Sequence, residues 1–293
     1  MSTQAGTVYI FKKSGGVWNY SQTITPPTPT SGGQFGYKTI ISGDHMVISE
    51  PGATSVTSPE TRAGVIHIYR LESGAWTPEQ TVDANIEARQ GDGLGKGLDF
   101  NGSYIAAGAP NGESGLRSGA VHAFYNDGTT WVWAGGGVYD PVDNPANMFG
   151  ENISIYSSSS VVVGVPLEST TATESGGVYL CTTIGCTKTP IKPPSPETNE
   201  HFGASVWIYD DIIIAGAPGK NGGQGAIYAI GLDSVNSWSL LSSSTVPNGV
   251  QAGEGFGSAV MGTSTGSLFI GSSSRDSSSL TDIGACYVME QTY

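Results

Sequence analysis

Phe202-Gly203-Ala204-Ser205-Val206 is followed by Ala215-Gly216-Ala217-Pro218 and then by Gly225-Ala226-Ile227-Tyr228. The aromatic–Gly pair opens one expected strand, Gly-Ala-Pro ends a second, and Gly-x-hydrophobic-aromatic opens a third. The same order recurs along nearly the whole chain at a period of about 55 residues, which is typical of propellers and solenoids. The glycine of the opening pair falls at Gly36, Gly95, Gly150, Gly203 and Gly257.

Each repeat unit is expected to contain four short antiparallel strands, which we call strands A to D. In the first unit they are expected at 35–40, 46–51, 65–69 and 76–82. Gly15-Gly16 joins two further alternating segments before this unit, and this pattern predicts a hairpin over 6–24. The fourth strand of the third unit is poorly marked, near 188–191, and no helix is indicated anywhere. Further units are expected to open near 94, 149, 202 and 256.

The composition fits this interpretation. The chain has 293 residues, of which 43 are Gly and 13% are charged. Glycine and hydroxyl or β-branched residues are weak helix formers, and they suit short strands joined by many turns. With 38% hydrophobic residues the chain can bury a core, so we expect one all-β domain over 1–293.

Twelve basic and 25 acidic side chains give a net charge of −13. This field repels phosphate backbones and anionic lipid, so we expect neither nucleic acid nor a membrane surface as a partner. No apolar run reaches the roughly 20 residues needed to span a bilayer. The N-terminus lacks the features of a signal peptide, so the chain is either not exported by that route or a mature or excised segment.

The five copies of aromatic-Gly, Gly-Ala-Pro and Gly-x-x-Tyr resemble the FG-GAP repeat family, which forms the β-propeller of integrin alpha subunits. The resemblance implies a propeller of four-stranded blades and a non-enzymatic role at a cell or particle surface. It covers nearly the whole chain. The departures are Leu94 for the aromatic, and Ser-Glu-Pro51, Gly-Val-Pro166 and Gly271-Ser-Ser for Gly-Ala-Pro.

The number of blades follows from counting strands. Strands A, B and D occur five times and strand C six times, because both ends of the chain supply a strand C. Five blades in one ring is therefore our first expectation. The alternative is part of a larger propeller, or one that exchanges terminal strands with a neighbour, because an unpaired strand edge invites a partner.

The resemblance also implies calcium in the A–B turns, but the turns here, such as 42–45 and 263–266, carry few carboxylates, whereas calcium takes six to eight oxygen ligands. We therefore expect no cofactor or metal in these turns, and calcium in the longer B–C loops, with Glu113 or Glu168 as a ligand, remains the alternative. Gly262-Thr-Ser264-Thr-Gly266 matches a nucleophile-elbow pattern and 91–97 a phosphate loop, yet both fall on strand turns or on the repeat itself. Histidines such as His201 do not group with a nucleophile, so no enzyme activity is expected.

Binding is expected on the variable B–C loops at 54–62, 111–117, 168–174, 219–224 and 272–282. A protein partner or self-association is the first expectation, and the alternative is a glycan held by aromatic platforms. The charged loop candidates are Glu60, Arg62, Glu113, Arg117, Glu168, Glu174, Lys220, Arg275 and Asp276, and the aromatic candidates are Trp18, Trp76, Trp131 and Trp238.

Two repeat positions favour packing. Strand D opens with Trp in most units, and blade-to-blade packing is the ordinary interpretation. One strand C position holds Tyr or His throughout, for example His67, His122 and Tyr228, which indicates packing or an inter-blade hydrogen bond.

Three cysteines leave the redox state open. Cys181 and Cys186 could close a hairpin disulfide or remain buried thiols, and Cys286 lies in another unit. Glycosylation sequons begin at Asn19, Asn101 and Asn152, and they matter only in a glycosylating compartment. An extracellular or particle-surface location is expected.

Overall fold

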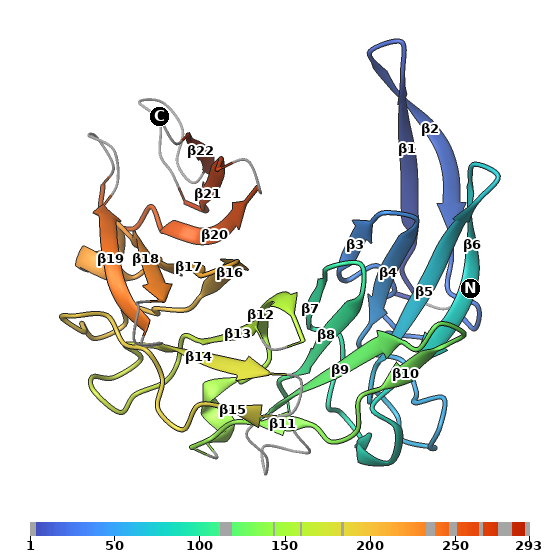
Figure 1. The fold of residues 1–293 in the computed structure, drawn as a ribbon, viewed down its shortest axis with the longest axis horizontal. Coiled ribbons are helices and arrows are strands. Elements are labelled where there is room, and N and C mark those ends of the chain that lie inside the picture. The colour runs from blue at the N-terminus through green and yellow to red at the C-terminus, as the bar shows by residue number, and fades with distance from the viewer. Residues whose placement is uncertain are drawn as a thin grey trace.

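The computed structural model describes residues 4–111, 119–142, 144–158, 160–182, 185–232, 238–245, 251–263, 266–274 and 283–290. The protein is mostly β, with 50% strand and 3% helix, and its strands form several small antiparallel sheets. The sheets follow one another around an arc, with the N-terminal hairpin at one end and the C-terminal sheet at the other (Figure 1).

The hairpin expected at the N-terminus is present as β1 (Val8–Ser14) and β2 (Val17–Ile24). The next sheet follows as β3 (Thr39–Ser42), β4 (His45–Glu50), β5 (Val65–Glu72) and β6 (Ala75–Val82). The second unit contains β7 (Gly97–Phe100), β8 (Tyr104–Ala109), β9 (Ala120–Asn126), β10 (Trp131–Trp133) and the additional β11 (Val138–Tyr139).

The third sheet contains β12 (Asn152–Ser157), β13 (Ser160–Val165), β14 (Gly177–Thr182) and β15 (Gly185–Cys186). The fourth contains β16 (Ser205–Tyr209), β17 (Ile212–Ala217), β18 (Ala226–Leu232) and β19 (Trp238–Thr245). The last sheet contains β20 (Phe256–Gly262), β21 (Leu268–Ser272) and β22 (Ala285–Met289). Apart from β11, which pairs with β9, the strands of each sheet are in sequential antiparallel order, as the repeat predicts.

A glycine just before strand C joins each unit to the next one. Gly6, Gly176 and Gly225 form isolated parallel bridges to Phe35, Phe202 and Phe256 of the following unit. All three have positive φ, and a Cβ atom on any of them would lie 2.0–2.1 Å from the partner's carbonyl oxygen. Only glycine allows this close backbone approach, which explains why the repeat keeps glycine there.

The aromatic of each opening pair packs against the strand C residue of its own unit. Phe202 and Tyr228 meet edge to face at 5.2 Å between ring centroids, and Phe35 meets His67 in the same way at 5.2 Å. The corresponding pairs in the third and fifth units are 5.9 and 5.3 Å apart. The opening aromatic and the Tyr or His of strand C therefore form one packing unit, which confirms the packing interpretation of that position.

The first strands of four successive sheets, and the residue just before the first strand of a fifth, line one cavity of about 210 Å³. Its lining includes Lys38 just before β3, Leu98 of β7, and residues of β12, β16 and β20. These strands lie at the inside of the arc, and the last strand of each sheet lies outside (Figure 1). Buried apolar clusters fill the space between neighbouring sheets. One cluster joins Val47 and Ile68 of the first four-stranded sheet to Phe124 and Trp131 of the second.

Several local features differ from the sequence expectation. The fourth strand of the third unit is the two-residue β15 rather than a strand at 188–191, where Ile191 forms only a single bridge to Val178. Among the described residues, three short helical turns occur although none was expected: η1 (Asn85–Glu87), η3 (Pro145–Asn147) and α1 (Lys220–Gly223). They lie in connecting loops, where strand periodicity carries no information. Within the described part of the chain, no helix has the length and apolarity to cross a membrane.

Candidate functional site

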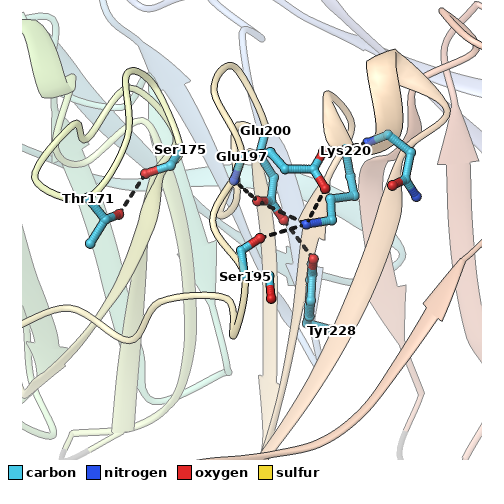
Figure 2. Close-up of polar contacts among 8 residues, drawn as sticks. Thr171, Ser175, Ser195, Glu197, Glu200, Lys220 and Tyr228 are labelled. Carbon is cyan, nitrogen blue, oxygen red and sulfur yellow. Dashed lines mark hydrogen bonds and ion pairs between the residues drawn. The ribbon is translucent and has the colours of Figure 1, made fainter.

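A group of ionisable side chains that includes a fully buried carboxylate lies where the third unit meets the fourth (Figure 2). Lys220 of α1 places its Nζ 2.9 Å from a Glu197 oxygen and 3.5 Å from a Glu200 oxygen, and it donates to the Ser195 carbonyl at 2.8 Å. Tyr228 of β18 donates its hydroxyl to Glu200 Oε1 at 2.6 Å. Glu200 is completely buried, so two loops and a strand are joined through one carboxylate.

The contacts within this group shift the pKa values of Tyr228 and Glu197 in opposite directions. Burial raises the pKa of Tyr228, and its bond to Glu200 raises it further. The bond from Lys220 lowers the pKa of Glu197. Near neutral pH these shifts favour the neutral form of Tyr228 and the ionised form of Glu197. The contacts connect two loops to β18.

Glu200 belongs to a repeated position that the sequence analysis missed. Two residues before the opening aromatic or Leu94, four units carry a buried polar side chain, and the first carries Gly33. A Cβ atom on Gly33 would lie 2.2 Å from Glu50 Oε1, so the Glu50 carboxylate fills this space and contacts His67 Nε2 at 2.8 Å. A polar residue repeated at a fixed offset was the available signal. The four buried residues are Asp92, Asn147, Glu200 and Glu254.

His122 occupies the strand C position that holds His67 in the first unit and Tyr228 in the fourth, but among the described residues it has no close carboxylate partner like Glu50 or Glu200. It is buried, and burial lowers its pKa to about 4. Its Nδ1 lies 3.9 Å from Glu87 Oε2, which in turn accepts from the hydroxyl of Tyr139 at 2.9 Å and from the Gly137 amide at 2.6 Å. His122 is therefore neutral at physiological pH.

The charged loop candidates do not share one environment. Glu168 is 1% exposed and forms an ion pair with Lys192, and Lys220 is mostly buried as described above. Glu174 contacts His201 Nε2 at 3.1 Å, Glu60 is partly exposed and Arg62 is exposed. Glu113, Arg117, Arg275 and Asp276 lie outside the described residues, as does part of the nucleophile-elbow pattern at Ser264.

The tryptophan candidates divide by position in the chain. Trp131 and Trp76 are 2% and 7% exposed, whereas Trp18 is 65% exposed. Trp131 meets Phe100 of its own sheet and His45 of the preceding sheet, at centroid distances of 5.7 and 5.6 Å. The buried pair thus packs between sheets and has no free face for a sugar ring. The side chain of Trp238 lies outside the described residues.

Exposed apolar side chains gather on the N-terminal hairpin. Besides Trp18, they are Tyr9, Phe11, Val17 and Tyr20. Phe11 and Tyr20 meet edge to face at 6.1 Å. The hairpin projects beyond the neighbouring sheet (Figure 1). A group of large exposed apolar residues on one element is typical of an interaction surface.

Cys181 and Cys186 form a disulfide between β14 and β15, and Cys286 is an exposed free thiol. The sequon asparagines differ in access: Asn19 is exposed, Asn101 bonds the Tyr156 carbonyl at 2.8 Å, and Asn152 lines the cavity between the first strands. No group of three His, Cys, Asp or Glu side chains suited to a metal ion occurs among the residues that the structure describes.

Comparison of the chain with protein-family models and with curated proteins finds no match.

Proposed function

We propose that the chain is a five-bladed β-propeller of the FG-GAP type, and that it works as a non-enzymatic surface protein that self-associates through its N-terminal hairpin. The cavity lined by the first strands of four sheets and by Lys38, next to β3, supports the propeller, since such strands surround the axis of that fold. A surface location agrees with the Cys181–Cys186 disulfide, because disulfides persist in oxidising surroundings.

Two relations indicate that the hairpin is the outer half of a blade. Gly6 bridges Phe35 as Gly225 bridges Phe256. Gln22 of β2 also forms two hydrogen bonds to the main chain of Trp76, at 2.7 and 2.9 Å. Gln80 of β6 makes the same pair of bonds to Trp131, at 2.6 and 2.8 Å. β1 and β2 therefore make the contacts with the next sheet that strands C and D make in the other units.

The C-terminal sheet has the complementary composition. It contains strands A, B and C as β20, β21 and β22, with no fourth strand among the described residues. Exposed apolar residues gather on it as well, including Met261 and Val288. Among the described strands, β1 pairs only with β2 and β22 pairs only with β21, so each lies at the edge of its sheet. Contact between the hairpin of one copy and the C-terminal sheet of a second copy would cover both apolar groups.

The exposed aromatic group on the hairpin is the observation that carries this proposal. Sedimentation velocity over a concentration series should show reversible self-association of the unaltered chain. Trp18→Ser and Tyr20→Ser should each weaken it, because each removes an exposed ring from the contact. Ile41→Ser on β3 removes an exposed apolar side chain elsewhere and should not. A monomer at every concentration would overturn self-association.

Sugar binding at inter-blade Trp platforms receives no comparable support, because Trp76 and Trp131 are buried.

A further inference from the structure

A second cavity, of about 300 Å³, lies between loops of the first and second units. The segment before Phe35 forms one wall, through Gly32 and Gln34, and the segment around Leu94 forms another, through Gly93 and Lys96. Arg62 and Asn111 complete the polar lining. A cavity of this size suits a small organic ligand rather than a bare ion.

The charge of this cavity is opposite to that of the protein as a whole. The chain carries 12 basic and 25 acidic residues, yet two of the basic residues, Arg62 and Lys96, line the cavity, and no described lining residue is acidic. The remaining side chains are amides, a hydroxyl and a proline, and glycine walls keep side chains out of the space. Two cations and neutral hydrogen-bonding groups suit an oxyanion with attached hydroxyl groups.

Lys96 is the central group. It is only partly exposed, and its Nζ bonds Asn111 Oδ1 at 2.8 Å, while Asn111 Nδ2 donates to the Gly91 carbonyl at 3.2 Å. Asn111 is thereby fixed in place and can satisfy only one of the three ammonium protons. Neither Lys96 nor Arg62 forms an ion pair with any described carboxylate. Lys192 and Lys220, by contrast, are both paired with buried glutamates.

The nearby buried acids Glu50 and Asp92 are held by other partners. Glu50 contacts His67 at 2.8 Å and accepts from Thr30 at 3.4 Å, and Asp92 accepts from the Arg89 amide at 2.8 Å. The position of Arg62 in the repeat is held by Arg117 in the second unit and by Glu174 in the third, and the position of Lys96 is held by Glu151 in the third unit. The pair of cations therefore belongs to the first junction and is not imposed by the repeat.

We propose that this cavity binds the phosphate or sulfate group of a small monoester, such as a sugar ester, with Lys96 and Arg62 as the anion-binding residues. Asn111 and Gln34 would receive the hydroxyl groups of the attached polyol. The overall charge of −13 disfavours long polyanions, so a ligand with a single anionic group fits best.

Isothermal titration of the full chain with glucose 6-phosphate, glucose 6-sulfate, inorganic phosphate and glucose tests the proposal. At least one ester should bind at millimolar concentration or below, and glucose should bind much more weakly. A preference between the esters identifies the source of the anion. Absence of binding by both esters, or equal binding of glucose, would overturn the proposal.

Lys96→Gln should lower the affinity for the ester by about tenfold or more, because it removes a charge-assisted bond. Arg62→Gln should lower it as well and should fold normally, since Gln4 already adopts the same left-handed backbone one unit earlier. Lys38→Gln makes the same change in net charge at the other cavity and should leave the affinity unchanged. Equal loss in all three variants would mean a nonspecific charge effect and would contradict the site.

Discussion

Trp18 and Trp76 hold the same position in successive units, yet Trp18 is 65% exposed and Trp76 is 7% exposed. Trp76 is covered because the β1–β2 hairpin packs against it, in a cluster with Ile10 and Ile24. No described sheet lies in that relation to Trp18. The contrast teaches that the apolar pattern of one unit is completed by the preceding unit, so the first unit presents the surface that the others bury.

The largest effect should come from removing the buried ring. Trp131→Ala should destabilise the fold by about 3–5 kcal/mol, because it leaves a cavity between two sheets. Trp18→Ala should change the stability of the dilute protein by less than about 0.5 kcal/mol. Chemical denaturation of both variants gives the comparison. Equal losses would mean that the hairpin is covered in the isolated chain.

The junction glycines allow a similar comparison. Gly225→Ala places a Cβ atom 2.1 Å from the Phe256 carbonyl oxygen, whereas the nearest atom to a Cβ at Gly284 is 3.5 Å away. Both glycines have positive φ, so both variants incur the left-handed penalty of about 1–2 kcal/mol. Gly225→Ala should lose about 3 kcal/mol or more in total. Similar melting temperatures for the two variants would contradict the junction.

The strand C position should show in the pH dependence of stability. His122 has a folded pKa of about 4 against an ordinary 6.5, so the unfolded chain binds the extra proton between these values. The free energy of unfolding should therefore fall as pH falls from 6.5 to 4, by at most about 3 kcal/mol. His122→Tyr introduces the tyrosine found at this position in other units and should remove this contribution to the pH dependence of stability. An unchanged pH profile would contradict a neutral buried histidine.

The smallest effect concerns the two glutamines that bond the main chain of the next tryptophan. Gln22→Ala and Gln80→Ala each remove two hydrogen bonds and should each lose about 1–2 kcal/mol. Equal values in denaturation measurements would support the placement of the hairpin as an outer half-unit. A loss confined to Gln80→Ala would show that the hairpin does not hold that place.

Much of the strand order could be predicted from the sequence, because the aromatic–Gly pairs and the strand C glycines report backbone conformation directly. Phe202 and Tyr228 pack together as buried aromatics, and Gly225 occupies the close backbone contact that only glycine allows. The cysteine state could not be predicted, since the spacing of Cys181 and Cys186 fits either thiols or a disulfide. The fourth strand of the third unit was misplaced because β15 has only two residues.

The contacts at the candidate sites were less predictable for a different reason. Glu200 contacts Lys220 and Tyr228 only after separate segments of the chain have folded together. It lies in a loop, where no alternating strand pattern marks which side chains become buried. The sequence marks Lys220 and Glu168 as binding candidates on the B–C loops, but their burial depends on partners distant in the sequence. Arg62 and Lys96 come together only at the junction of two units.

The most direct test of the five-bladed arrangement is the distance between its first and fifth inner strands. Spin labels at Lys38→Cys and Ser258→Cys, in a Cys286→Ser background, can be measured by double electron–electron resonance at dilute concentration. Convergence on one axis predicts a narrow distance below about 20 Å, whereas a linear stack of sheets about 10 Å apart would separate the labels by about 40 Å. A distance near the larger value would contradict the propeller.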